Sequence, residues 1–191
     1  RIDGGATLDD AATIAAQDGE LAFTTDGFVV APLFFPGGDI GQLAVFGTVN
    51  DLAVSGARPV AIGLALMIEE GLSIALLERV LRSAAEAAAR ARVAIVAGDT
   101  KVVPRGAVDK LFIAASGIGV RVPPSPVGPA SLRPGDAILV TGPIGRHGIA
   151  VMNAREGLAI QPEPMSDCAP LTPLVEALRS AGVPVRAMRD A

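Results

Sequence analysis

Five prolines fall within thirteen residues in the run VPPSPVGPASLRP, positions 122–134. Proline has no backbone N–H and a fixed φ, so such a run forms neither a helix nor a central strand. We expect a linker here, between an N-terminal domain at 1–121 and the start of a second domain at 135–191. Two helices are predicted beyond the linker, at 148–156 and 170–181. Two helices are too few to close a core, so this second domain is expected to be incomplete.

Strand-like and helix-like patterns alternate along the chain, which predicts an α/β fold. Strands are expected at 21–30, with Asp26 and Gly27 as a turn or bulge inside it, and at 59–68, 93–96 and 109–120. After the linker, strands are expected at 136–141 and 183–188. Asp39 and Ser73 are expected to cap two helices. The second helix has apolar residues at helical spacing and charged residues opposite, typical of a cover on a sheet.

Composition and charge exclude several classes of function. Aromatic residues make up 3% of the chain, with no Trp or Tyr, and the net charge is -4. These values argue against a nucleic-acid partner, since such surfaces use aromatic platforms and basic charge. No apolar run reaches 18 residues, so no membrane span is expected. The single cysteine, Cys168, excludes an internal disulfide and indicates the cytoplasm as the compartment.

The run AGDTKVVPRG, positions 97–106, follows the strand expected at 93–96. Gly98 is expected to turn the backbone and to place Asp99, Thr100 and Lys101 together at the strand end. Only two of the 16 basic residues are lysines, Lys101 and Lys110. A lysine in an arginine-rich background is a candidate for chemistry, because its charge is compact and tunable. The alternative, that these are ordinary turn residues in water, stays open.

Three carboxylates stand on segments that can converge: Asp26, Asp51 and Asp99. Oxygen ligands of this kind hold Mg²⁺, often together with substrate phosphates. Asp51 and its neighbour Asn50 lie inside an apolar helical segment, where an unpaired carboxylate is costly, so a partner or a cation is expected. Each aspartate taken singly is also explained by a turn or a cap.

Weaker candidates lie nearer the C-terminus. No Walker A pattern is present, and Gly142 to Gly148 lacks the spacing of a dinucleotide-binding loop, so a tight turn is expected there. His147, the single histidine, is expected to be a surface or capping residue. Cys168 precedes a predicted helix, which can lower a thiol pKa, but without a basic partner it is expected to be structural.

Taken together, these segments resemble a known family. LAFTTDGFVVAPLFFPGGDIG, GTVNDLAVSGA, AIVAGDTKVVPRG and GPIGRHGIAVMNAREGL occur in the same order in the HypE family of hydrogenase maturation proteins, and SDCAPL and AMRD continue the match. The resemblance covers nearly the whole chain. The wider superfamily includes aminoimidazole ribonucleotide synthetase, selenophosphate synthetase and thiamine-monophosphate kinase, all of which use ATP.

The resemblance implies a fold, an activity and partners. It implies an N-terminal α/β domain whose strands form a β-barrel across a homodimer, followed by a C-terminal α/β domain. The implied reaction is the ATP- and Mg²⁺-dependent dehydration of a carbamoyl group on a C-terminal cysteine to a thiocyanate. HypF supplies the carbamoyl group, and the cyano group passes to iron in the HypC–HypD complex for nickel–iron hydrogenases.

The resemblance also assigns residues. Asp26, Asp51 and Asp99 would hold the magnesium ion and the ATP phosphates, supported by Asn50 and Thr100. Lys101 would act near the thiocarboxamide, as a base or as a stabilising charge.

Some positions depart from the family pattern. Gly27 stands where the family has Ser, and Ala31 stands where Asp is common. The family's glycine-rich N-terminal segment and its reactive C-terminal cysteine are not in this sequence, so we expect the chain alone to be inactive. Two alternatives are a dimerisation and docking module, suggested by the small-residue helix at 41–55, and a sister enzyme of the same superfamily.

Overall fold

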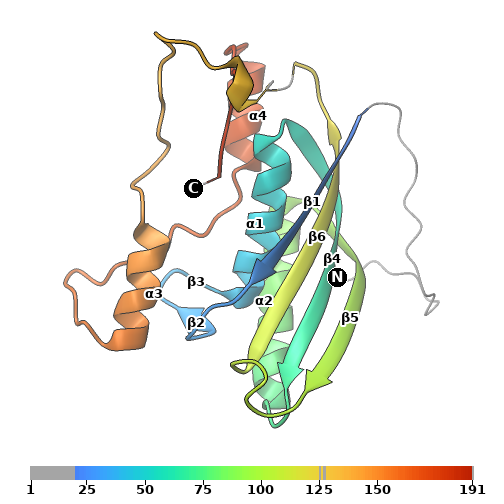
Figure 1. The fold of residues 1–191 in the computed structure, drawn as a ribbon, viewed down its shortest axis with the longest axis vertical. Coiled ribbons are helices and arrows are strands. Elements are labelled where there is room, and N and C mark those ends of the chain that lie inside the picture. Colours follow the sequence, from blue (N-terminus) through green and yellow to red (C-terminus); the bar gives the residue numbers. More distant parts are fainter. Residues whose placement is uncertain (1–19, 125, 127, 191) are drawn as a thin grey trace.

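The structure is a computed structural model that describes residues 20–190 except 125 and 127 (Figure 1). Its elements, in chain order, are β1 (Leu21–Phe28), β2 (Phe34–Phe35), β3 (Gly38–Asp39), α1 (Ile40–Val54), β4 (Ala57–Glu69), α2 (Ile74–Ala91), β5 (Ala94–Val103), β6 (Leu111–Arg121), the 3₁₀ turn Pro129–Ser131, α3 (Arg146–Glu156) and α4 (Thr172–Ser180). The α/β class expected from the sequence is confirmed.

Four long strands form one mixed sheet in the order β1-β6-β4-β5. β6 runs antiparallel to both of its neighbours, whereas β4 and β5 are parallel. The turn or bulge expected at Asp26 and Gly27 is wrong. Both residues pair in unbroken register with Ala115 and Ala114 of β6, because the ladder to a full-length neighbour holds the backbone extended. β1 and β5 are the two edges of this sheet.

Both long helices lie on the same face of the sheet (Figure 1). α1 packs across β1, β6 and β4, and α2 packs on α1 and reaches β5. On β4, buried Leu64, Leu66 and Ile68 face the helices, while Ala65 and Met67 on the other face are half-buried. Phe23 of β1 is 71% exposed. The face away from the helices therefore remains partly open among the described residues.

α1 is buried on nearly all sides, which explains its apolar, small-residue sequence. Asp39 caps it as expected, accepting hydrogen bonds from the backbone N–H groups of Gly41 and Gln42. A Cβ on Gly41 would lie 2.6 Å from the Val80 carbonyl oxygen, so the glycine lets α1 and α2 cross closely. The small residues of α1 thus serve packing inside the described fold, and the dimerisation and docking alternative stays a prediction.

α2 is amphipathic and begins after Ser73, whose side chain accepts a hydrogen bond from the Leu76 N–H, as expected. The apolar residues at helical spacing predict a stripe through Ile74, Leu77, Leu81, Ala84 and Ala88. Ala84 and Ala88 are buried as expected, but Ile74 and Leu81 are exposed, and the rest of the buried stripe is Val80, Ala87 and Ala91. The stripe is rotated because α2 packs mainly on α1 and much less on the sheet, where β5 is its main neighbour.

Beyond residue 121 the structure has two helices and long irregular segments. Helix α3 and helix α4 confirm the two expected helices. The strands expected at 136–141 and 183–188 are wrong. Among the described residues neither segment joins a strand ladder, and Ile138 is 91% exposed; the Arg186 carbonyl accepts a single backbone hydrogen bond, from the Gly128 N–H. No helix in the described residues is long and apolar enough to cross a membrane.

Candidate functional site

The segment that contains Lys101 lies within strand β5, so the turn expected at Gly98 is wrong. β5 continues through Gly98 to Val103, because parallel pairing with β4 keeps it extended: Ala65 is opposite Asp99, and Met67 is opposite Lys101. Paired residues share a face of the sheet, so Asp99 and Lys101 lie on the face away from the helices and Thr100 on the helix side. All three side chains are exposed.

Asp51, inside α1, has a hydrogen-bond partner, as expected from its position in an apolar helix. The Thr24 hydroxyl of β1 donates a hydrogen bond of 2.9 Å to Asp51 Oδ2. Asp26 lies two residues after Thr24, so it occupies the same face of β1, towards α1. Asp26 is exposed, and its Oδ1 accepts a 2.9 Å hydrogen bond from the Gly27 N–H. The seam between β1 and α1 therefore carries two carboxylates.

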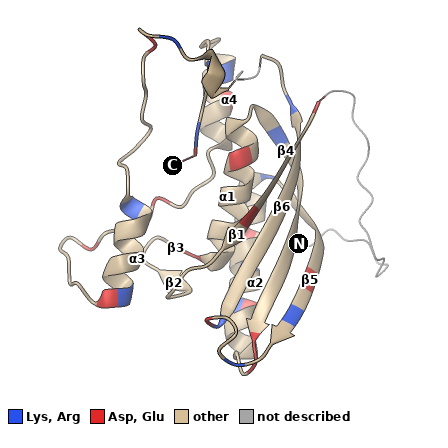
Figure 2. Ribbon diagram, in the orientation of Figure 1, with Lys and Arg blue, Asp and Glu red and all other residues tan. Residues whose placement is uncertain are grey.

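The three aspartates do not meet within one chain. Asp26 is on β1 and Asp99 on β5, at opposite edges of the sheet and on opposite faces. Three strand spacings correspond to about 14 Å. Figure 2 shows the acidic positions of β1 and α1 on one side of the sheet, and the acidic and basic positions of β5 on the other. In the part of the chain that the structure describes, no three His, Cys, Asp or Glu residues could hold a metal ion together.

A cavity of about 510 Å³ opens beside Asp51. Its walls are β1, the C-terminal end of α1, the proline-rich segment and the C-terminal tail. The lining residues include Thr24, Asp51, Arg121, Gly128, Pro129 and Met188. The Arg121 guanidinium is bonded to Glu20 at 3.1 Å and to the Pro126 carbonyl at 3.0 Å, and brings positive charge to this wall. The cavity thus combines a carboxylate, a hydroxyl and a guanidinium.

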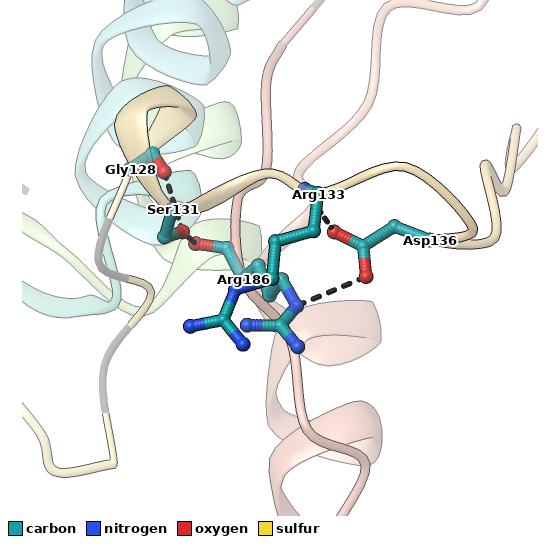
Figure 3. A network of polar contacts seen from close by, with 5 residues as sticks. All are labelled: Gly128, Ser131, Arg133, Asp136 and Arg186. Carbon is teal, nitrogen blue, oxygen red and sulfur yellow. Dashed lines mark hydrogen bonds and ion pairs between the residues drawn. The ribbon is translucent and has the colours of Figure 1, made fainter.

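A polar network holds the outer wall of the cavity together (Figure 3). The Gly128 N–H donates to the Arg186 carbonyl at 3.0 Å, and the Ser131 hydroxyl lies within hydrogen-bonding distance of both the Gly128 and Arg186 carbonyls. Asp136 accepts from the Arg133 N–H at 2.8 Å and from Arg186 Nε at 3.0 Å. Two segments far apart in sequence are therefore joined beside the cavity.

Asn50 turns away from the cavity and binds the C-terminal part of the chain. Its Nδ2 donates to the Ala169 carbonyl at 3.1 Å, and its Oδ1 accepts from the Leu171 N–H at 2.8 Å. Asn50 is buried, with 6% of its surface exposed. Its assignment as an ATP-binding residue stays a prediction; its observed contacts are with backbone.

The loop after β5 is fixed by a carboxylate that the sequence did not reveal. Glu69, the last residue of β4, accepts hydrogen bonds from the Gly106 N–H at 2.7 Å and the Lys110 N–H at 3.1 Å. These two backbone donors lower the Glu69 pKa, with a smaller contribution from nearby Arg105. Glu69, Thr24 and Arg121 were all missed because their partners are far away in sequence; only the threonine pair before Asp26 gave a local signal.

His147 and Cys168 are structural in this fold. His147, in the first turn of α3, packs edge-to-face on Phe35 and lies 3.1 Å from the Ser166 hydroxyl, so it is neither a cap nor a free surface residue. Burial, with a smaller contribution from Asp39, raises the pKa of Cys168 to about 12. A thiol with this pKa is inert, which agrees with the expected structural role. The turn expected at 142–148 is confirmed in part: residues 144–145 form a turn, with Gly145 at φ 81°, and residues 146–148 already belong to α3.

The family profile described as "AIR synthase related protein, N-terminal domain" matches residues 8–121, and "AIR synthase related protein, C-terminal domain" matches residues 133–191. The chain belongs to the AIR synthase related family. Within this family it is homologous to carbamoyl dehydratase HypE of Escherichia coli strain K12, with 50% identity over 95% of the chain and 54% of the relative. The chain spans about half the length of the curated relatives it matches.

Two solved structures of AIR synthase related proteins carry information about ligands and partners. A hydrogenase maturation protein HypE in complex with ATP has a TM-score of 0.85 and 51% identity, covering 90% of this chain and 51% of that one. A HypE–HypF complex has a TM-score of 0.87 and 50% identity, covering 92% of this chain and 58% of that one. The resemblance noted in the sequence is confirmed at the level of homology.

The donor chemistry of the β1–α1 seam fits a magnesium ion in part. Mg²⁺ in nucleotide sites is usually held by one or two carboxylates together with phosphates and water. Asp26 and Asp51 supply two carboxylates on one side of the sheet, beside a cavity that also carries Arg121. Asp99 cannot join them within the same chain.

Proposed function

We propose that this chain carries the ATP-binding part of a carbamoyl dehydratase that acts in the maturation of nickel–iron hydrogenases. Homology to HypE carbamoyl dehydratases and a HypE structure solved with ATP support the assignment. The observation that carries it is the cavity at Asp51, where carboxylate, hydroxyl and guanidinium groups meet. We place magnesium-bound ATP phosphates at this seam, on Asp26 and Asp51.

The proposed reaction converts a cysteine thiocarbamate, R–S–CO–NH₂, into a thiocyanate, R–S–C≡N. The carboxamide oxygen attacks the γ-phosphorus of ATP, ADP leaves, and the C–O bond then breaks to release phosphate. Two protons leave the nitrogen as the C≡N bond forms. Lys101 stabilises the transferred phosphoryl charge or accepts a proton, and magnesium, when bound, neutralises charge on the ATP phosphates. The resulting cyano group is the ligand delivered to iron.

The acting cysteine in this proposal is a C-terminal residue of the kind the HypE family carries. Cys168 does not fit the role, because burial raises the pKa of its thiol to about 12. The domain division proposed here keeps residues 1–121 as the ATP-binding and dimer-forming unit, 122–134 as linker and 135–191 as the beginning of a second domain.

We further propose that the protein works as a homodimer in which each site uses both protomers. Asp26 and Asp51 lie at the β1 edge, while Asp99, Thr100 and Lys101 lie at the β5 edge. The partly open sheet face, with Phe23 71% exposed, is the surface that a second copy would cover to form a β-barrel. HypF as carbamoyl donor, HypC–HypD as cyanide acceptor and a cytoplasmic location belong to the same proposal; the structure of a HypE–HypF complex supports the first.

The test uses the two lysines. In the full-length protein carbamoylated by HypF, ATP and Mg²⁺ should give thiocyanate, detected as a 25 Da increase on the cysteine relative to the free thiol. Lys101→Ala should abolish this product. Lys110→Asn is the matched control: Lys110 is exposed in the next loop with φ 65°, a conformation that Asn tolerates, and the variant should stay active. Normal thiocyanate formation by Lys101→Ala would refute the role of that residue.

A further inference from the structure

Two successive residues of α1 point to different parts of the molecule. Neighbouring residues on a helix are about 100° apart, so Asn50 and Asp51 cannot face the same way. Asp51 faces Thr24 on β1 and the cavity. Asn50 faces the segment that leads into α4. The two neighbours thus connect α1 to the sheet on one side and to the C-terminal part on the other.

Asn50 makes the kind of contact that fixes a segment in one position. Both ends of its amide are used, the nitrogen on the Ala169 carbonyl and the oxygen on the Leu171 N–H. Leu171 is the N-cap residue of α4, and no side chain of α4 caps that end. The backbone donor at the start of α4 is therefore satisfied by a side chain of α1, more than a hundred residues earlier in the sequence.

The segment held by Asn50 continues to the cavity. α4 runs from Thr172 to Ser180, and the tail after it places Met188 in the cavity wall. In the same tail, the Arg186 carbonyl accepts a hydrogen bond from the Gly128 N–H. This bond holds Gly128 and Pro129 in another part of the cavity wall. The outer wall of the cavity is thus built from segments whose place depends on where α4 sits.

We propose that Asn50 is a positioning residue: it fixes the start of α4 on α1 so that the C-terminal part closes the cavity at Asp51. The inference rests on the proposed function, in which that cavity takes ATP. It assigns Asn50 a role through the protein backbone and no contact with the nucleotide.

Hydrogen exchange and ATP binding test the proposal in the full-length protein. Asn50→Ala should speed exchange at the Leu171 N–H, which loses its acceptor, and at the Gly128 N–H, which is far from Asn50 in sequence. A lost buried hydrogen bond corresponds to about a tenfold change in the local equilibrium, and ATP with magnesium should bind more weakly by a similar factor in calorimetry. Asn50→Ser is a milder second variant in case the alanine protein folds poorly.

Asn153→Ala is the matched control. Asn153 is also buried, at 8% exposed, but its Oδ1 accepts from the Ile160 N–H at 3.0 Å, within its own segment. This variant should lose stability without changing Gly128 exchange or ATP affinity. A second arm needs no substitution: ATP binding to the unmodified protein should slow exchange at Leu171 and Gly128, since coupling between sites is reciprocal.

Three results would overturn the inference. These are unchanged Gly128 exchange in both Asn50 variants, unchanged ATP affinity in both, or an equal loss of affinity in Asn153→Ala. If the unmodified protein binds no ATP, the proposed function fails instead. Gly128 exchange then still decides whether Asn50 positions the wall.

Discussion

Activity recovered by mixing two inactive variants would test whether each site spans two protomers. The perturbations are Asp51→Asn, at the β1 side of the sheet, and Lys101→Ala, at the β5 edge. Three strand spacings and two opposite faces separate these positions in one chain, about 14 Å before side chains are counted. In a mixed dimer with shared sites, one site carries both lesions and the other carries none. Random assembly makes half of the dimers mixed, so about a quarter of the wild-type activity should return.

The assay uses two affinity tags on co-expressed chains, so that mixed dimers are isolated and thiocyanate formation is measured directly. Purified mixed dimers should have about half of the wild-type activity per dimer. The matched control pairs Asp26→Asn with Asp51→Asn: both carboxylates lie on the same side of one chain, so every site keeps a lesion and nothing is recovered. Mixed Asp51→Asn and Lys101→Ala dimers that stay inactive would refute the shared site.

Three further predictions concern stability and reactivity. Gly41→Ala should cost about 1–3 kcal/mol in urea unfolding, because its Cβ would overlap the Val80 carbonyl, whereas Gly27→Ala, with no atom within 4 Å, should be close to neutral; equal effects would refute this packing argument. Because the pKa of Glu69 is lowered in the fold, its stabilisation is present above its unfolded pKa, about 4.3, and is lost as the pH falls through the folded value. The stability difference between wild type and Glu69→Gln should therefore be present at pH 7 and vanish in strong acid, and a difference that does not change with pH would contradict it. Cys168 should resist iodoacetamide at pH 8 until the protein is unfolded, and rapid labelling of the folded chain would show that its pKa is not raised.

The sequence predicted those features that depend on neighbours along the chain. Asp39 and Ser73 were recognised as helix caps because a cap satisfies N–H groups only two or three residues away. The position of Asp51 inside an apolar helix correctly indicated a partner, since an unpaired carboxylate there is costly. The partner itself, Thr24, could not be identified, because it comes from another element.

The errors arose where pairing with distant strands decided the backbone. Gly98 and Gly27 look like turn residues, yet ladders to β4 and β6 keep both extended. The converse holds at 136–141, where strand-like residues have no pairing partner among the described residues and remain irregular. Convergence of Asp26, Asp51 and Asp99 was inferred without the strand order, and that order places Asp99 at the other edge.

Lys101 lies on β5, an edge strand of the sheet. An exposed strand edge is a template for adding further chains, and natural proteins often guard such edges with lysine or other charges. Asp99 and Lys101 are the charged residues of β5, so we expect them also to protect this edge in a single chain. Removing the lysine charge should increase self-association as well as abolish chemistry. Lys101→Arg, which keeps the charge on the edge, separates the two effects.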